Sequence, residues 1–247
     1  MNAPASDRVA VVTGGARGIG YAIARRFIND GIRVAILDID SGLSDAVKEL
    51  GPDAVGFECD ITSPPAVKRT AAAVAKSVGE VAVLVNSAGI ARKGALIDIS
   101  SSTIRSILAV NLIGTIEVTR AFLPSIIAAP LGRIIMLSSD AARVGVPRES
   151  IYAASKAGVV GFAKSLAIEV AKTDTTVNVI SPGPIETPML NALLSPEQLE
   201  HRMGQNPMRR FGTTDEVAAL AAYLVSSEAS YVSGQVVSIN GALIRVD

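Results

Sequence analysis

The chain has 247 residues, of which 49% are apolar and 19% charged, and its 23 basic side chains are balanced by 23 acidic ones. This composition is typical of a globular protein, and the balanced charge argues against nucleic acid or an anionic membrane as the main partner. The single cysteine, Cys59, excludes an internal disulfide. The single histidine, His201, argues against a zinc site and against Ser-His-Asp or Cys-His catalysis, unless it is itself the base.

Short apolar runs rich in β-branched residues alternate with longer segments of helical periodicity. The predicted strands span residues 8–13, 33–38, 54–60, 81–86, 133–139, 176–181 and 235–240. The predicted helices span residues 18–30, 42–50, 64–78, 101–127, 152–171 and 214–226. Because no alternation of apolar and polar residues survives in the strands, we expect both faces of the sheet to be buried. No linker or repeat divides the chain, so we predict one doubly wound, Rossmann-like α/β domain over residues 1–247, with about seven parallel strands and helices on both faces.

The first residues, "MNAPASDR", lack the basic segment and apolar core of a signal peptide. Apolar runs such as "AALAAYLV" are too short to span a bilayer. We therefore expect a cytoplasmic protein without a membrane partner.

A glycine-rich turn, "TGGARGIG" at 13–20, joins the first predicted strand to the first predicted helix. Gly14, Gly18 and Gly20 would permit a tight turn, close approach of a pyrophosphate and close helix–strand packing, and the helix N-terminus would face the phosphates. The spacing differs from the G-x-G-x-x-G form, and a purely structural turn is the alternative. The position directly after the first buried strand favours nucleotide binding.

Asp38 follows Gly20 by 18 residues and ends the second predicted strand. A carboxylate at this place can accept hydrogen bonds from the adenosine ribose, and it would repel a 2′-phosphate. Arg17 acts in the opposite direction, because a guanidinium in the glycine turn could bind a 2′-phosphate, unless its side chain is merely solvated. We weigh Asp38 more heavily and predict NAD as the cofactor, with NADP as the alternative.

Tyr152 and Lys156, in "SIYAASKAG", are four residues apart and so share one face of a predicted helix. A free phenol has a pKa of about 10, and roughly 4 kcal/mol of preference for the phenolate would bring it near 7. One cation about 4 Å away could supply that energy. The pair could therefore perform acid–base chemistry, although the same spacing is also found on ordinary surface helices.

Six motifs occur together in the order and spacing of one family. They are "TGGARGIG" at 13–20, "NSAG" at 86–89, Asn111 in "LAVNL", "SS" at 138–139, "YAASK" at 152–156 and "PGPIET" at 182–187. From about residue 7 to 241 the chain resembles the short-chain dehydrogenase/reductase family, and especially its β-ketoacyl reductase-like, secondary-alcohol dehydrogenase branch. The resemblance implies an NAD(P)-dependent enzyme that interconverts a secondary alcohol and a ketone by hydride transfer.

The resemblance also implies roles for individual residues. Tyr152 would be the general acid/base, Lys156 would lower its pKa and hold the nicotinamide ribose, Ser139 (or Ser138) would bind the substrate oxygen, and Asn111 would hold a relay water. The implied cofactor-binding residues are Gly14, Arg17, Gly18, Ile19, Gly20, Asp38, Asp60, Ile61, Asn86, Ala88, Gly89, Tyr152, Lys156, Pro182, Gly183, Ile185 and Thr187. The structural alternatives are that Ser139 caps a turn and that Asn111 satisfies helix backbone groups.

Residues 188–212, with one helical segment, would by position form a flap over the substrate. Its Met, Leu and Phe side chains would favour an apolar substrate body, or would simply pack. Arg143 and Arg148 should border the substrate mouth, where they could attract a carboxylate or the phosphates of a coenzyme A thioester, or remain solvated loop charges. His201, within the flap, is expected to be a surface residue.

The branch that the chain resembles often receives its substrate on an acidic acyl carrier protein, but "SIIAAPLG" at 125–132 contains no basic residue for such a partner. We therefore expect a small-molecule substrate, a 3-hydroxyacyl or 3-oxoacyl thioester or a cyclic alcohol. A sugar or polyol dehydrogenase, a non-catalytic dinucleotide-binding sensor and a non-redox epimerase are the alternatives. Apolar helices near 103–127 and 152–171 suggest subunit contacts, and we expect a homodimer or the homotetramer common in the family.

Overall fold

The computed structural model describes residues 8–245, so the predicted domain 1–247 and the opening stretch extend beyond the described residues. Seven parallel strands form one sheet in the order β3-β2-β1-β4-β5-β6-β7. The strands are β1 (Val9–Thr13), β2 (Arg33–Asp38), β3 (Ala54–Glu58), β4 (Val81–Asn86), β5 (Arg133–Leu137), β6 (Thr176–Pro182) and β7 (Val236–Ile239). The predicted doubly wound, Rossmann-like α/β fold is confirmed.

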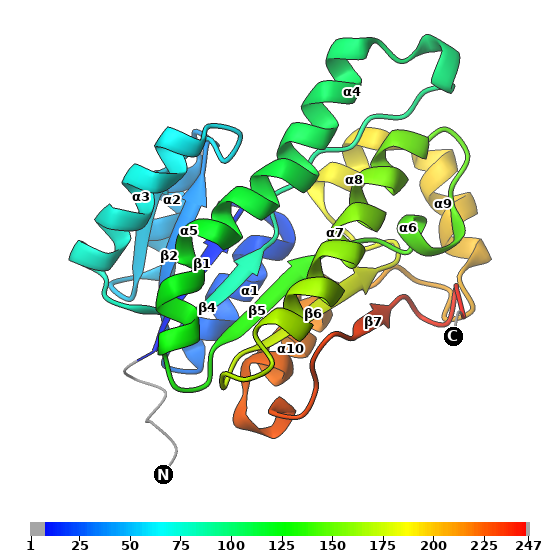
Figure 1. Ribbon diagram of the computed structural model, residues 1–247. Coiled ribbons are helices and arrows are strands. Elements are labelled where there is room, and N and C mark those ends of the chain that lie inside the picture. Colours follow the sequence, from blue (N-terminus) through cyan, green and yellow to red (C-terminus); the bar gives the residue numbers. More distant parts are fainter. Residues whose placement is uncertain (1–7, 246–247) are drawn as a thin grey trace.

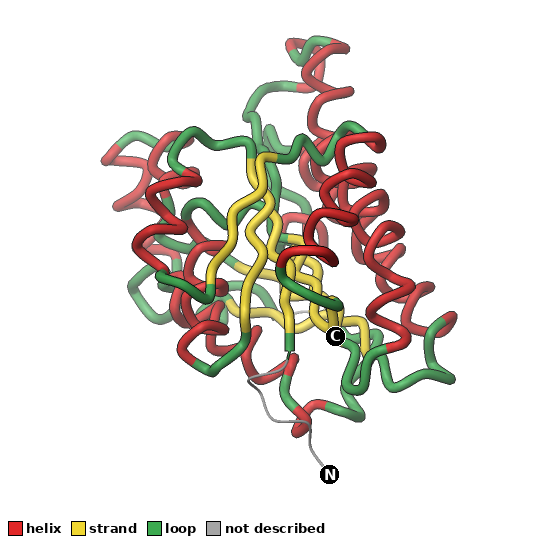
Figure 2. Tube along the Cα trace, turned by 90° about the vertical axis from the view of Figure 1, so that its left-hand side faces the viewer, coloured by secondary structure: helices red, strands yellow, loops and turns green. Residues whose placement is uncertain are grey.

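Helices cover both faces of the sheet, which Figure 2 shows as a layer between two layers of helices. The helices are α1 (Gly18–Asn29), α2 (Leu43–Leu50), α3 (Pro64–Ser77), α4 (Ser101–Leu108), α5 (Thr115–Ala128), α6 (Ala141–Val144), α7 (Ser150–Glu169), α8 (Pro188–Leu193), α9 (Pro196–Gln205) and α10 (Thr214–Val225). Helices α3, α5 and α7 pack on one face, and α1 and α10 pack on the other (Figure 1).

The uninterrupted apolar runs of the central strands follow from this two-sided burial. Along β1, Val9 and Val11 enter the core beneath α3, α5 and α7, whereas Ala10 and Val12 enter the core beneath α1 and α10. Because successive side chains of a strand point to opposite faces, both sets must be apolar. The expectation of complete burial is wrong for the edge strands β3 and β7, which have a neighbouring strand on one side only and are partly exposed.

The long helix predicted over 101–127 is divided by a six-residue π-helical segment, Ala109–Gly114, between α4 and α5. The whole stretch Ser101–Ala128 has the length and mean hydropathy, 28 residues and 1.4, that would allow it to cross a membrane by these two criteria alone. The expectation that every apolar segment is too short is therefore corrected for this helix. In the fold, Ile107, Val118 and Phe122 from this stretch are buried against the rest of the domain.

The carboxyl ends of the strands all open on one edge of the sheet, where the predicted site residues follow. Strands β3 and β5 each end two residues earlier than predicted, at Glu58 and Leu137, so Asp60 and Ser139 lie in loops beyond them. The predicted flap, residues 188–212, contains two helices, α8 and α9, where a single helical segment was expected.

Candidate active site

The glycine turn after β1 has the geometry that a dinucleotide needs. Gly20 packs so closely that a Cβ at this position would lie 2.2 Å from the carbonyl oxygen of Gly14. Gly18 has a φ of +60°, and its nearest neighbour on the Cβ side is Thr187 Cγ2 at 4.0 Å, which leaves room for a ligand. Arg17 is the N-cap residue of the 12-residue helix α1, and its side chain accepts no hydrogen bond from the first turn. The first N–H groups of α1, including that of Ile19, therefore have no acceptor from the N-cap side chain. Free amides at a helix N-terminus suit a pyrophosphate.

The carboxylate of Asp38 lies at the end of β2, against the glycine turn. Its Oδ2 accepts a hydrogen bond from the Ala16 N–H at 3.0 Å, and its Oδ1 accepts from the N–H groups of Ile39 at 2.8 Å and Asp40 at 3.0 Å. Sequence reasoning missed Asp40, whose carboxylate forms an ion pair with Arg17 at 3.2 Å. The guanidinium of Arg17 is thus neutralised by a second acid, and this end of the groove carries two carboxylates and one cation.

The loops after β3 and β4 carry the next predicted contacts. Asp60 is exposed and accepts hydrogen bonds from the N–H of Thr62 at 2.9 Å and its hydroxyl at 2.7 Å, whereas Ile61 is buried. Asn86 is also buried, and its Nδ2 donates to Thr119 Oγ1 at 3.0 Å.

Thr13, another residue that the sequence did not single out, organises the loop after β4. Its hydroxyl oxygen accepts the N–H groups of Ser87 and Ala88, each at 3.1 Å. The loop after β4 is thereby fastened to the end of β1, beside the glycine turn.

The segment after β6 follows the opposite wall. Pro182 ends β6, and the N–H of Gly183 donates to the Ile239 carbonyl at 3.0 Å. Ile185 is buried and forms an isolated bridge with Gly212. Thr187 is the N-cap of α8, with its hydroxyl accepting the Leu190 N–H at 3.2 Å. A Cβ added to Gly18 would lie 4.0 Å from Thr187 Cγ2, so the segment after β6 lies beside the glycine turn.

Asn111 is fully buried within the π-helical segment. Its Nδ2 donates to the Ile90 carbonyl at 2.9 Å and to Ser155 Oγ at 3.0 Å, and its Oδ1 accepts the Ile90 N–H at 2.8 Å. The carboxamide therefore links the loop after β4 to α7. Its side-chain hydrogen bonds are made within the protein, and the relay water expected at Asn111 stays a prediction.

Lys156 is buried in α7, and its Nζ donates to the Leu137 carbonyl, at the end of β5, at 2.7 Å. A methyl group added to Gly89 would lie 3.3 Å from this Nζ and 3.4 Å from Asn111 Oδ1, so the three residues surround one point. Burial lowers the pKa of Lys156 to about 8. The loop after β4, the π-helical segment and α7 thus converge on a single ammonium group.

Tyr152 lies one turn earlier on α7, with its ring centroid 6.0 Å from Lys156 Nζ. Burial raises the pKa of Tyr152 to about 12, the hydrogen bond with the Ser139 side chain acts to lower it, and the charge of Glu149 acts to raise it. The expected phenol pKa near 7 is therefore not produced by the protein's own groups. The expected pKa near 7 assumed a cation about 4 Å from the phenol in a polar medium and did not include the burial of Tyr152 and Lys156.

The two candidate serines make different contacts. Ser138 is buried, and its hydroxyl donates to the Lys156 carbonyl at 3.0 Å. Ser139 Oγ accepts the Ala141 N–H at 3.2 Å, which is the turn cap considered from the sequence, and the same side chain hydrogen-bonds Tyr152. Of the two, only Ser139 is in contact with the phenol.

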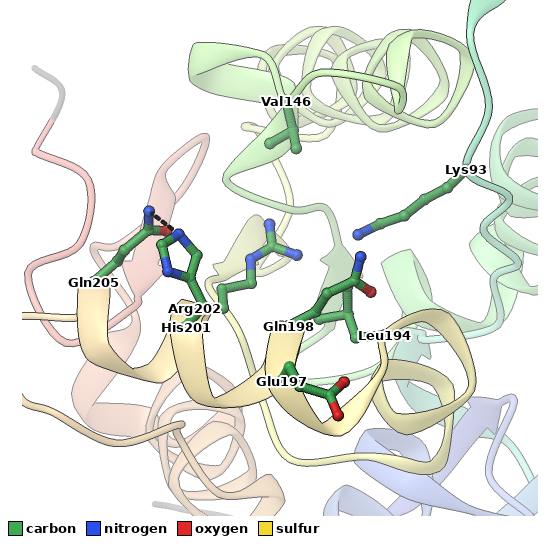
Figure 3. Close-up of a pocket in the computed structure, with 8 residues that line it drawn as sticks. All are labelled: Lys93, Val146, Leu194, Glu197, Gln198, His201, Arg202 and Gln205. Carbon is green, nitrogen blue, oxygen red and sulfur yellow. Dashed lines mark hydrogen bonds between the residues drawn. The ribbon is translucent and has the colours of Figure 1, made fainter.

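A cavity of about 350 Å³ lies between α9 and two loops that flank the Tyr152 region (Figure 3). Its lining residues are Lys93, Val146, Leu194, Glu197, Gln198, His201, Arg202 and Gln205. The apolar flap residues expected to face a substrate contribute only Leu194, while Met203 and Met208 are exposed. His201 is exposed, as expected, and its ring nitrogen Nε2 is 3.1 Å from Gln205 Nε2.

The two arginines predicted at the substrate mouth do not line this cavity. Arg143 donates to Ser238 Oγ on β7 at 2.7 Å. Arg148 is exposed and has a φ of +67°, and its carbonyl accepts the Gly94 N–H at 3.0 Å.

The fold and this arrangement define a class: a Rossmann-like domain with a glycine turn after β1 and a Tyr–Lys pair at the carboxyl edge of the sheet. A family model described as "Enoyl-(Acyl carrier protein) reductase" matches residues 14–243. The chain belongs to the short-chain dehydrogenase/reductase family.

Several relatives show what the chain is similar to. It is 39% identical over 241 residues to the 3-oxoacyl-[acyl-carrier-protein] reductase MabA of Mycobacterium bovis, covering 97% of this chain and 94% of the relative. It is 37% identical over 240 residues to the 3-oxoacyl-[acyl-carrier-protein] reductase FabG of Buchnera aphidicola, covering 96% of this chain and 98% of the relative.

Solved structures agree in fold. A variant of the actinorhodin polyketide ketoreductase, crystallised with NADPH, has a TM-score of 0.93 and 35% identity and covers 98% of this chain and 99% of that one. The aldohexose dehydrogenase of Thermoplasma acidophilum, in ligand-free form, has a TM-score of 0.88 and 32% identity, with 98% of each chain covered. The chain is accordingly an oxidoreductase that acts on CH–OH groups, interconverting a secondary alcohol and a ketone with a nicotinamide dinucleotide.

Proposed function

We propose that Tyr152 is the general acid/base of this reaction and that Ser139 holds the substrate oxygen. The observation that carries the proposal is the contact of the Tyr152 phenol with the Ser139 side chain, one helical turn from the buried ammonium of Lys156. In the oxidation direction, the carbinol C–H bond breaks with its electron pair leaving as hydride. The O–H proton passes to the Tyr152 oxygen, and a C=O bond forms. Reduction reverses each transfer.

A bound nicotinamide would supply the hydride chemistry, and in its oxidised form it would bring a positive charge. Such a charge near Tyr152 would favour the phenolate and so lower the raised pKa of this residue. Lys156 contributes as a second cation below its own pKa of about 8. With Asn111 it also encloses the point beside Gly89, where a ribose hydroxyl would find a donor in Nζ and an acceptor in Oδ1. The cofactor-binding residues given above remain part of this proposal.

NAD is the proposed cofactor. The carboxylates of Asp38 and Asp40 lie together at the end of β2, and Arg17, a cation that could attract a 2′-phosphate, is paired with Asp40. A 2′-phosphate would meet two like charges there, whereas a ribose hydroxyl could donate to the remaining lone pair of Asp38. The relative crystallised with NADPH supports the alternative, NADP.

The proposed substrate is a small 3-hydroxyacyl or 3-oxoacyl thioester, or a cyclic alcohol, that enters beneath the flap of residues 188–212. The names of the relatives that act as 3-oxoacyl-[acyl-carrier-protein] reductases support the acyl chemistry. The similarity to an aldohexose dehydrogenase supports a sugar or polyol as the alternative.

We also propose a homodimer or homotetramer in the cytoplasm. Exposed apolar side chains support self-association: Ile97, in a short 3-10 turn ahead of α4, is 93% exposed, and Ile168, on α7, is 78% exposed. Light scattering coupled to gel filtration would test this assembly, and a monomer at micromolar concentration would contradict it.

The test of the catalytic role is Tyr152→Phe, assayed by nicotinamide absorbance on a panel of secondary alcohols and 3-hydroxyacyl thioesters, with NAD and then NADP. Turnover should fall by about 10²- to 10⁴-fold, as expected for loss of a general acid/base, while dinucleotide binding measured by calorimetry is retained. Tyr231→Phe, at an exposed position, is the matched control. Full activity of Tyr152→Phe would refute the role.

The same panel tests the other classes of function. Stoichiometric cofactor reduction by any substrate contradicts a non-catalytic sensor. It also contradicts a non-redox epimerase, which would show no net reduction.

A further inference from the structure

The cavity beside α9 has a charge pattern that neither the family nor the proposed mechanism requires. In Figure 3 the Lys93 ammonium and the Arg202 guanidinium both extend into the cavity from its two sides, with the Gln198 amide close by. The Glu197 carboxylate is directed away from both cations, and it accepts a hydrogen bond from Ser195 Oγ at 2.7 Å. The cavity interior therefore presents two cations and an amide.

One of the two cations is already neutralised. Lys93 Nζ lies 3.3 Å from Glu149 Oε1, and both side chains are largely buried, with exposed fractions of 26% and 11%. Arg202 is different, because among residues 8–245 its guanidinium has no ion-pair or hydrogen-bond partner. One net positive charge thus faces the cavity, and it belongs to a planar group that can bind a carboxylate or phosphate through two parallel hydrogen bonds.

The position of the cavity connects it to the reacting centre. Glu149, the partner of Lys93, is the N-cap residue of α7, three residues before Tyr152. The loop that carries Lys93 is joined to the same segment by the hydrogen bond from the Gly94 N–H to the Arg148 carbonyl. Val146, which lies between Ser139 and Tyr152 in the sequence, also lines the cavity. A volume of about 350 Å³ is at the small end of ligand sites. This size suits a small substituent better than a long acyl chain.

We propose that Arg202 and Lys93 form a substrate subsite that binds an anionic group, a carboxylate or a phosphate, carried by the secondary alcohol or ketone. The inference rests on the proposed function and specifies its substrate class. It assigns the charge recognition to the flap helix α9 and the loop after β4, and not to Arg143 or Arg148. The same anionic chemistry is offered by a hydroxy or oxo acid and by a phosphorylated or phosphopantetheine-linked substrate.

The test compares wild type with Arg202→Gln on three probes: 3-hydroxybutyrate, its neutral methyl ester, and glycerol 3-phosphate, which carries a secondary alcohol beside a phosphate. Wild type should prefer at least one anionic probe over the ester, and which one is preferred distinguishes carboxylate from phosphate. Arg202→Gln should lower kcat/KM for that probe by about 10- to 100-fold, mainly through KM, as loss of a charge-assisted pair predicts. Turnover of the ester should be unchanged.

Two further variants make the result specific. Arg202→Lys keeps the charge without the planar fork and should recover part of the lost kcat/KM. Lys172→Gln removes one positive charge at an exposed position in the turn after α7 and should change nothing. Equal losses on the anionic probe and the ester, or no preference for an anion in wild type, would overturn the subsite.

A binding measurement separates this inference from the proposed reaction. Malonate and inorganic phosphate are titrated by calorimetry into wild type and Arg202→Gln, each saturated with NAD. Binding of either anion that weakens by about tenfold or more in the variant supports the subsite even if none of the three probes is oxidised. Equal affinities in the two proteins overturn the subsite even if the ester is oxidised normally.

Discussion

Asn240, the residue after β7, donates a hydrogen bond from Nδ2 to Oδ2 of Asp140, the residue after Ser139. The other carboxylate oxygen of Asp140 accepts the hydroxyls of Ser181 at 2.9 Å and Ser238 at 3.1 Å. Asp140 is buried and pairs with three donors from β6 and β7. The loop that carries Ser139 is therefore fixed in place by the last two strands of the sheet.

Asp140→Asn should weaken this attachment. The amide replaces one acceptor by a donor, so at least one of the three donors loses its partner, at a cost of about 1–3 kcal/mol in the free energy of unfolding. Because Ser139 is displaced while the glycine turn is untouched, kcat should fall more than the affinity for the dinucleotide. Chemical denaturation, steady-state kinetics and calorimetry measure the three effects. Asp53→Asn, on an exposed turn, is the control, and equal behaviour of the two variants would contradict the positioning role.

Ser139→Ala and Ser138→Ala form a matched pair. Loss of the Ser139 hydroxyl removes the hydrogen bond that lowers the pKa of Tyr152, so kcat for oxidation should fall by about 10²-fold, and the ascending limb of the pH–rate profile, on which the Tyr152 phenolate forms, should move to higher pH. Ser138→Ala loses only the bond to the Lys156 carbonyl and should cost about 1 kcal/mol of stability, with a smaller effect on kcat. The reverse order of the two kcat values would exchange the roles of the serines.

The buried ammonium of Lys156 should make stability depend on pH. Its pKa falls from 10.5 in the unfolded chain to about 8 in the folded protein. Between these values the unfolded chain binds the proton and the folded protein does not, so the unfolding free energy of wild type rises with pH by about 1.4 kcal/mol per unit. This contribution is absent below pH 8 and complete only above 10.5.

Lys156→Met removes that slope. The unfolding free energy of wild type minus that of Lys156→Met should therefore rise by about 2–3 kcal/mol between pH 8 and pH 10. Denaturation curves should stop at pH 10, because the raised pKa of Tyr152 acts in the opposite sense between 10 and about 12. Lys172→Met, at an exposed position, should run parallel to wild type. A pH-independent difference for Lys156→Met would show that the buried amine keeps its ordinary pKa.

Cofactor choice can be tested at the end of β2. Asp38→Asn keeps an acceptor for the Ala16 N–H but removes the charge, so the ratio of kcat/KM for NAD to that for NADP should fall by about tenfold. Asp40→Asn releases Arg17 from its ion pair and should lower the same ratio through better use of NADP. A wild-type ratio below one would contradict the predicted preference for NAD.

The sequence predicted the strands and their two-sided burial well in the middle of the sheet, but not at its edges. A run such as residues 54–60 looks like a buried strand, yet whether a strand has one neighbour or two depends on the order β3-β2-β1-β4, which no local pattern contains. Likewise, nothing in the composition of "AVNLIG" distinguishes this π-helical segment from an ordinary α-helix. The helical segment expected within the flap corresponds to α9, where Ser195 and Gln198 form a capping box with Pro196 in the first turn.

For the site, the spacing of residues along one element predicted which of them act together, whereas contacts between different elements could not be predicted. The glycine turn and the Tyr152–Lys156 pair are local, and the structure places both at the predicted edge of the sheet. The roles proposed for three residues depend on groups far away in the chain, so nothing near them in the sequence distinguishes them. These residues are Asp140, Arg202 and Lys93. The direction in which the pKa of Tyr152 shifts could not be predicted from the sequence either, because burial is a property of the folded domain.

The contact between Asp140 and Asn240 has a consequence for biosynthesis. A nascent chain that has emerged as far as Lys156 already contains Asn111, Ser139, Tyr152 and Lys156, but the strand that braces the Ser139 loop lies some eighty residues further on. Contacts of such long separation require a large loop to close, which slows their formation. We therefore expect the Ser139 loop to be braced only after β7 has joined the edge of the sheet, so a chain that has emerged only as far as Lys156 should lack activity.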